Sequence, residues 1–179
     1  MIKPFSFSRI EIRDLTISAA LVAAVGLSLA GFRLRLDIMI SLTLVFISVF
    51  LLHEIAHKLV AQRYGLWAEF RLTLFGALLT LLSTVSPIKF ISPGAVMVAG
   101  PMSRETMGKT AIAGPSTNIV LSVVSFVLSC FPLGVLSNIA VLSAAFNAWI
   151  ALFNLFPIGM LDGLKVFSWN KIVWSAAFI

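Results

Sequence analysis

Four long apolar runs restrict the folds that this chain of 179 residues can adopt. Each run is long enough to cross a bilayer as a helix, and short polar or charged connectors separate the runs. Hydrophobic residues make up 60% of the sequence and charged residues only 11%, whereas a typical soluble domain carries about 25% charged residues. A water-soluble core of this size could not bury so much apolar surface. We therefore predict helical spans at 15–31, 38–62, 110–131 and 139–158.

The segment between the second and third spans follows a different pattern. Residues 67–75 alternate polar and apolar side chains, as a strand does. Residues 76–86 are apolar but too few to cross, and residues 88–98 have strand composition broken by a Pro-Gly pair. Irregular backbone survives at membrane depth only where protein covers it or where it faces a water-filled cavity. We therefore predict an all-α polytopic membrane protein with about four transmembrane helices, together with a small membrane-associated β region and a re-entrant loop.

The ends of the chain carry weaker signals. Residues 1–14 mix charged and apolar side chains, which indicates a short strand or an interfacial segment. The pair Gly114-Pro115 interrupts the third apolar run near its start, and residues 172–179 resemble a further span cut short at residue 179. No internal repeat or soluble accessory domain is visible in the sequence. We therefore interpret residues 1–179 as a single transmembrane core.

Basic residues give the chain a net charge of +6, with 13 Lys+Arg against 7 Asp+Glu. They stand at the ends of apolar runs, where such residues anchor spans and set topology, and not in the aromatic-rich polar clusters of nucleic-acid-binding surfaces. If the N-terminus lies inside, only Arg33 and Arg35 fall on the outer side. The inner side then carries Lys3, Arg9, Arg13, Lys58, Arg63, Arg71, Lys89, Arg104, Lys109, Lys165 and Lys171. We predict a multi-pass protein of the cell membrane, with its N-terminus towards the cytoplasm and no nucleic-acid partner.

The residues best suited to chemistry form the run His53-Glu54-Ile55-Ala56-His57, near the C-terminal end of the second span. The two histidines, the only two in the chain, are four residues apart, so both imidazoles leave one face of a helix. A carboxylate in the middle of a span costs roughly 2.5–3.5 kcal/mol on insertion scales, which favours a functional role for Glu54 over a packing role. The spacing is that of a zinc site with a glutamate as general base. A polar contact between helices is the alternative.

Two histidines leave a catalytic zinc short of one protein ligand. Asp162 is the candidate, because it follows the fourth span directly and is the only acidic residue after Glu105; an ordinary helix-end aspartate is the alternative. Cys130, the single cysteine, is a weaker candidate, since the loop charges put it near the opposite face. Glu69 and Glu105 lie in polar segments, where we expect solvated side chains.

The motif at His53–His57, taken with the later run Asn154-Leu155-Phe156-Pro157-Ile158-Gly159-Met160-Leu161-Asp162-Gly163, resembles the site-2 protease family of intramembrane zinc metalloproteases. The resemblance is to a small prokaryotic form without PDZ or CBS domains. The late motif of the family reads Asn-x-x-Pro-x-x-x-x-Asp-Gly. The resemblance implies that His53, His57 and Asp162 hold one zinc ion per chain. It also implies that Asn154 lies near the metal and helps to hold the substrate or the oxyanion.

Two further segments resemble the same family. One lies at the start of the third span and reads Gly114-Pro115-Ser116-Thr117-Asn118. The other reads Leu74-Phe75-Gly76-Ala77 and resembles the glycine-containing re-entrant loop of the family, although a second glycine is usual where Ala77 stands.

Several polar residues allow more than one role. We interpret Asn147 as structural and Lys58 and Arg63 as interfacial anchors, and we expect Pro157 to kink or end its helix. Asn118 fits either a bond across helices or a direct role in the active site.

The resemblance implies a zinc metalloendopeptidase that cleaves peptide bonds within or near the transmembrane segments of membrane proteins, as in regulated intramembrane proteolysis. A spanning substrate must unwind to expose a peptide bond, and the strands within 66–98 could hold it by β-addition. Expected partners are therefore transmembrane substrates and the lipid bilayer. Two alternatives remain open: a zinc-binding membrane scaffold or metal-handling protein without protease activity, and a different membrane metalloprotease in which Asp162 is not a ligand.

Overall fold

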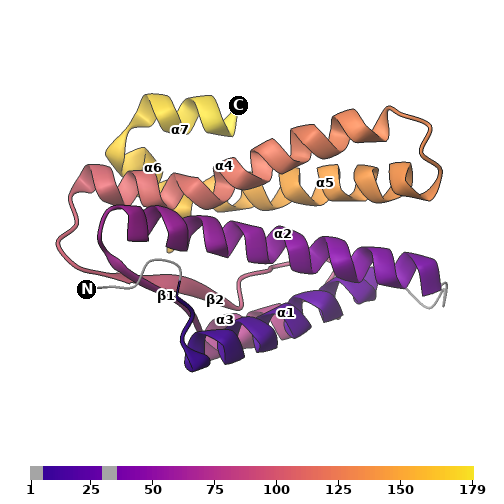
Figure 1. The fold of residues 1–179 in the computed structure, drawn as a ribbon, viewed down its shortest axis with the longest axis horizontal. Coiled ribbons are helices and arrows are strands. Elements are labelled where there is room, and N and C mark those ends of the chain that lie inside the picture. The colour runs from indigo at the N-terminus through magenta and orange to yellow at the C-terminus, as the bar shows by residue number, and fades with distance from the viewer. Residues whose placement is uncertain (1–5, 30–35) are drawn as a thin grey trace.

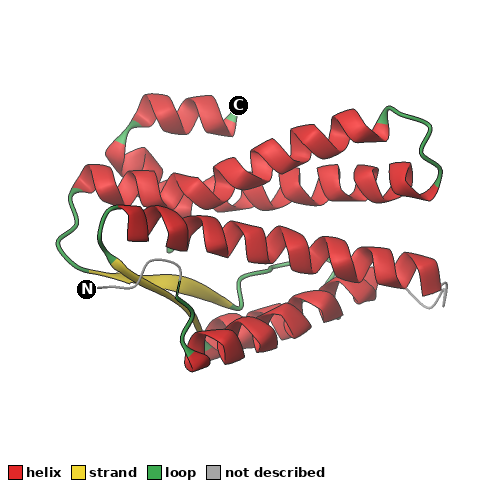
Figure 2. Ribbon diagram, viewed as in Figure 1, coloured by secondary structure: helices red, strands yellow, loops and turns green. Residues whose placement is uncertain are grey.

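The computed structural model describes residues 6–29 and 36–179, and helices dominate it (Figures 1 and 2). In this described part, four helices are long and apolar enough to cross a membrane: α1 (Arg9–Leu29), α2 (Leu36–Arg63), α4 (Arg104–Ser129) and α5 (Val135–Leu155). The predicted fold class is confirmed, and the chain is an integral polytopic membrane protein. Of the basic residues that support the predicted topology, Lys3, Arg33 and Arg35 lie outside the described residues.

Helices α1 and α4 begin about two turns earlier than their apolar runs. The pattern of residues 1–14 indicates a strand or an interfacial segment, but α1 starts at Arg9 and residues 1–5 lie outside the described part. Helix α4 starts behind a Ser103 cap, whose hydroxyl accepts from the Thr106 N–H. Hydropathy missed both beginnings because polar residues form them.

The chain between α2 and α4 forms a re-entrant hairpin, which lies beside α1 and α2 (Figure 1). It contains β1 (Trp67–Leu72), α3 (Leu74–Leu82) and β2 (Gly94–Ala99), with the strands antiparallel. The Thr73 hydroxyl caps α3 by accepting from the Gly76 N–H. The two predicted strands are present, but residues 88–93 are irregular, since Pro93 cannot donate to a ladder.

This hairpin runs along α1 towards the far end of the bundle. The Phe70 N–H of β1 donates to Glu11 near the start of α1, at 3.0 Å, and the Lys89 ammonium donates to the Ser28 hydroxyl near its end, also at 3.0 Å. At 1.5 Å per residue, the stretch of α1 between these contacts covers about 25 Å, most of a hydrocarbon core. Lys89 therefore lies near the far end of α1. The prediction that Lys89 lies on the same side as the N-terminus is wrong.

Helix α2 occupies the centre of the bundle, where it contacts α1, α4, α5 and both strands (Figure 1). Phe46 of α2 packs edge-to-face against Phe146 of α5, with ring centroids 4.1 Å apart, and Phe50 packs in the same way against Phe70 of β1. Antiparallel helices α4 and α5 pack along one side of α2, and many of their outward apolar side chains are exposed, as lipid-facing side chains are. The C-terminal half of α2, which carries the histidine motif, is thus enclosed by protein.

Two short helices follow the last span, α6 (Asp162–Trp169) and α7 (Lys171–Phe178). Helix α5 ends at Leu155, two residues before Pro157, in agreement with the expected helix end. The Trp174 indole N–H donates to the Leu155 carbonyl oxygen at 2.8 Å and ties α7 to the end of α5. The chain thus turns back, so that the start of α6 lies beside α4 and faces α2.

A buried ion pair joins α1 to α2. The Lys58 ammonium lies 2.5 Å from one Glu11 carboxylate oxygen, and neither side chain is more than 2% exposed. The other Glu11 oxygen accepts the Phe70 N–H, and Lys58 also donates to the Ser6 carbonyl oxygen. Lys58 is therefore not an interfacial anchor, as its place near the end of an apolar run suggested, because Glu11 compensates its charge inside the protein.

Candidate metal centre

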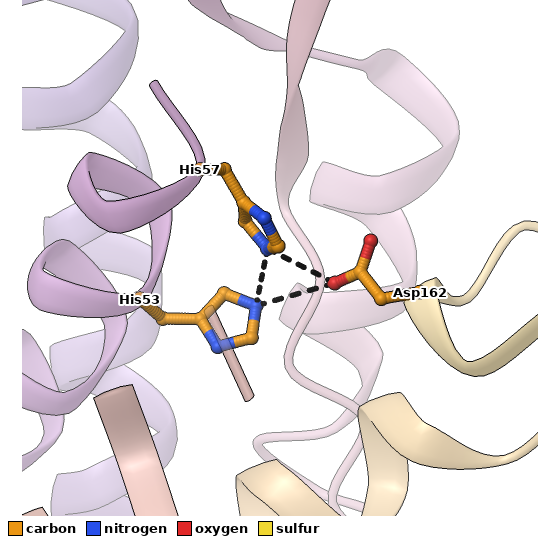
Figure 3. A group of neighbouring side chains, drawn as sticks. All are labelled: His53, His57 and Asp162. Atoms are coloured by element: carbon orange, nitrogen blue, oxygen red, sulfur yellow. Dashed lines mark hydrogen bonds and ion pairs between the residues drawn. The ribbon is translucent and has the colours of Figure 1, made fainter. Parts of the chain in front are cut away.

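His53 and His57 project from one face of α2, and Asp162 faces them from the start of α6 (Figure 3). Nε2 of His57 lies 3.0 Å from Nε2 of His53 and 3.0 Å from Oδ2 of Asp162. Nε2 of His53 lies 3.6 Å from the same carboxylate oxygen. Both imidazoles are buried and the carboxylate is nearly so. Three potential donor atoms from two distant parts of the sequence thus converge on one point.

Hydrogen bonds determine which nitrogen of each imidazole is free. Nδ1 of His53 lies 2.5 Å from Oδ1 of Asn118, and Nδ1 of His57 lies 2.8 Å from the Thr110 carbonyl oxygen. Both partner atoms are acceptors, so each Nδ1 carries the proton and each Nε2 keeps its lone pair. The two lone pairs point at one another and at the Asp162 carboxylate, an arrangement that needs a cation between them.

A chain of amides behind His53 sets the orientation of Asn118. The Asn118 Nδ2 group donates to Oδ1 of Asn147 at 2.8 Å, and Nδ2 of Asn147 donates to the Ser143 carbonyl oxygen at 2.8 Å. A carbonyl can only accept, so each amide orientation follows from the next. Asn118 therefore bonds across helices while its oxygen supports His53, and Asn147 has the structural position that its sequence context suggested.

The two oxygens of Asp162 have different surroundings. Oδ2 faces the imidazoles, while Oδ1 accepts from the Lys165 ammonium at 3.2 Å. One carboxylate oxygen is thus held by Lys165, and the other is directed at the histidines.

This set of donors fits a zinc ion. Ligand atoms 2.0–2.1 Å from a tetrahedral ion lie about 3.3 Å from one another. The separations between the donor atoms of His53, His57 and Asp162 run from 3.0 to 3.6 Å and bracket that value. Each histidine also has the hydrogen bond on its second nitrogen that metal-binding imidazoles require.

Gly114 of α4 leaves space for the cluster. A Cβ atom at this position would lie 2.7 Å from Nε2 of His53 and closer still to Nε2 of His57. Only glycine allows α4 to approach the imidazoles this closely. Helix α4 also continues unbroken through Pro115, so the Gly-Pro pair does not interrupt the span as the sequence suggested.

Glu54 and Asn154 lie beside the cluster and line one cavity together with His53. The backbone N–H of Val96 in β2 points at the Glu54 carboxyl. The Asn154 Nδ2 group donates to the Ile150 carbonyl oxygen at 2.9 Å, which fixes its amide at the cavity wall. A carboxylate and an amide therefore border the same small space next to the potential metal position.

Other acidic residues and the cysteine lie away from the centre. Glu105 is exposed and pairs with Lys109 on α4, as expected for a solvated side chain. Glu69, in contrast, is largely covered, because it pairs with Arg71 and accepts from the Ser8 hydroxyl. Cys130 is exposed at the end of α4, opposite to the end that meets the histidines.

Sequence reasoning missed the supporting roles of Glu11 and Lys165. Glu11 is 47 residues from Lys58, and no periodicity connects the two. Lys165 could have been found, because it stands three residues after Asp162 in a helix, where side chains are neighbours.

Comparison with known proteins identifies relatives along almost the whole chain. The profile of Peptidase family M50 matches residues 41–135, which include the histidine motif. The Putative zinc metalloprotease MJ0611 of Methanocaldococcus jannaschii is 40% identical over 175 residues, which cover 96% of this chain and 90% of the relative. The Putative zinc metalloprotease YwhC of Bacillus subtilis is 29% identical over 162 residues, which cover 73% of this chain and 69% of the relative. No solved structure matches significantly.

Proposed function

Because the chain belongs to peptidase family M50, the site-2 protease family, we propose that it hydrolyses peptide bonds within or near the transmembrane segments of other membrane proteins. Zinc is its cofactor, in line with the printed names of both relatives and with the donor set. The reaction would take place inside the bilayer, because the histidines stand within a helix long and apolar enough to span it. Regulated intramembrane proteolysis is the process that such an activity would serve.

We assign His53, His57 and Asp162 as the ligands of one zinc ion per chain. The observation that carries this assignment is the orientation of the imidazoles, since hydrogen bonds on both Nδ1 atoms turn two lone pairs towards one carboxylate. Bound zinc would lower the pKa of its water to roughly 7 and would polarise the scissile carbonyl. The Lys165 contact leaves only one Asp162 oxygen for the ion, which suits a site that must keep an open position.

Glu54 acts as the general base and then as the general acid. Its carboxyl lies at the cavity beside His53, outside the set of three ligands, and takes a proton from the attacking water. It then passes that proton to the leaving amine. Asn154 uses one amide hydrogen on the Ile150 carbonyl oxygen and has a second with which to hold the substrate carbonyl or the oxyanion.

The outer edge of β2 is the position for an extended substrate. Glu11 and Asp14 of α1 accept the Phe70 and Leu72 N–H groups and so close the outer edge of β1. Because Phe70 pairs with Val96 in this register, the N–H and C=O groups of Val96 also point away from the partner strand. The Val96 N–H lies near the Glu54 carboxyl, so a strand added to β2 would pass the general base.

The same geometry supports an active site near the N-terminal side of the membrane, which we assign to the cytoplasmic face of the plasma membrane. Lys58 adjoins His57 and pairs with Glu11 in the first turn of α1. Arg9 and Arg63 stand at the corresponding helix ends, as the positive-inside rule requires of a cytoplasmic side.

The test is incubation of the purified full chain with a single-span test protein, with and without a zinc chelator. Glu54→Gln should retain zinc and lose cleavage by at least about 100-fold, the usual contribution of a general base. The matched control is Glu105→Gln, which changes an exposed glutamate and should cleave normally. Persistent cleavage by Glu54→Gln contradicts the mechanism. Zinc binding without cleavage by the unaltered chain would favour a scaffold or metal-handling protein instead.

A second arm tests the substrate strand. Val98→Pro removes an N–H from the outer edge of β2 without breaking the ladder to β1, because Val98 pairs with Ala68 as Val96 does with Phe70. Cleavage should fall by at least about tenfold with zinc retained, because the substrate strand loses one hydrogen bond to β2 and no longer fits closely against this edge. Val98→Ala is the control, and equal cleavage by both variants would exclude addition at this edge.

A further inference from the structure

The cavity beside Glu54 extends away from the ligand cluster into an apolar part of the bundle. Its polar border consists of His53, Glu54, Asn154 and Ser92. Its interior is walled by aliphatic and aromatic side chains of α1, α2 and α5, among them Phe46, Phe50, Phe146 and Ile150. Because Phe46 and Phe50 precede His53 on α2, the apolar end of the cavity points towards the middle of the membrane.

The size of this cavity limits what can enter. It offers about 30 Å³ to the centres of water-sized groups, whereas a single water needs at least about 10–15 Å³ by that measure. Phe46 and Phe146 pack against each other at its wall, and Phe46 is buried. There is room for a side chain with one to three carbon atoms, but an aromatic ring would have to displace this pair.

The cavity adjoins the edge on which an extended substrate would lie. Ile91 and Ser92 border it and lead directly into β2 through Pro93. Side chains of an added strand alternate between its two faces. When a peptide group lies at the polar border between Glu54 and Asn154, an adjacent side chain can therefore turn into the apolar interior.

We propose that this cavity is a specificity pocket, which accepts a small apolar side chain, from alanine to valine in size, on one of the two residues that flank the scissile bond. The inference rests on the proposed protease function and adds a substrate class to it. Charged side chains are excluded because the interior walls offer them no partner, and leucine and aromatic side chains are excluded by size.

The experiment uses single-span test proteins whose cleavage site is first located by mass spectrometry. Each residue flanking that site is then replaced in turn by alanine, valine, leucine, phenylalanine and tryptophan. At one flanking position, kcat/KM should fall at least about tenfold from alanine or valine to phenylalanine or tryptophan. Phe146→Ala, which enlarges the pocket, should raise the relative rate on the phenylalanine substrate about tenfold. Phe126→Ala is the matched control, because Phe126 is an exposed residue of α4 away from the cavity.

The outcomes separate the pocket from the protease assignment. Equal cleavage of all substrates overturns the pocket and leaves the protease standing, as does a preference that Phe146→Ala leaves unchanged while zinc content stays normal. A substrate series that the unaltered chain does not cleave at all overturns both. If Phe146→Ala fails to fold, the size limit of the unaltered chain alone decides the question.

Discussion

At the scale of single residues, the candidate metal centre depends on which nitrogen of each imidazole is unprotonated. The spacing of His53 and His57 in the sequence is enough to predict a shared face, and the resemblance supplies Asp162. Neither could predict that Asn118 and Thr110 would hold the two Nδ1–H groups, because that depends on how α4 packs against α2. Local spacing thus predicted the two histidines and the resemblance the aspartate, whereas the tautomers of the histidines required the tertiary structure.

Asn118 should therefore contribute to zinc affinity without touching the ion. Asn118→Ala removes the acceptor of the His53 Nδ1–H and leaves the amide of Asn147 without its donor. We expect zinc affinity to fall about 10- to 100-fold, as for other groups that orient a ligand imidazole. Competition with a chromophoric chelator measures this. Asn138→Ala, an exposed asparagine at the far end of the bundle, should leave affinity unchanged, and equal affinity of both variants would contradict the role of Asn118.

At the scale of elements, the spans were predictable and their polar ends were not. Windows of about 20 apolar residues identify a helix whatever it packs against, and all four spans follow from them. The start of α1 was missed because Glu11 and Asp14 read as surface residues, although they are buried against β1 and Lys58. Glu11 and Asp14 can be buried because their hydrogen-bonding partners come from segments distant in sequence.

The pair of Glu11 and Lys58 should reveal itself in thermal unfolding in detergent. Glu11→Gln or Lys58→Met alone leaves one buried charge without its partner, at a cost of about 3–5 kcal/mol. The double variant removes both charges, and we expect it to be more stable than either single variant. The glutamine can still accept the Phe70 N–H, so the comparison isolates the ion pair. Additive losses in the double variant would show that the two residues act independently.

At the scale of the whole molecule, both the order of the spans and the exposed cysteine bear on orientation. Cys130 follows α4 at the end opposite to the metal centre, whereas Tyr64 follows α2 near it. If the centre faces the cytoplasm, a membrane-impermeant maleimide should label Cys130 in intact cells. A Tyr64→Cys variant in a Cys130→Ser background should be labelled only after permeabilisation. The reverse pattern would place the centre on the outer side.

The position of His57 near the end of α2 has a consequence for the products. At 1.5 Å per residue, the stretch from His57 to Arg63 is about 9 Å long, so a cut made here divides the substrate's span unequally. If a span of about 20 residues is cut at this depth, about 14 residues stay on one piece and about 6 on the other. The piece with about 6 residues falls far below the roughly 17 that a span requires, so it would leave the bilayer more readily than the longer one. The proposed cut would thus yield two products that differ in their hold on the membrane.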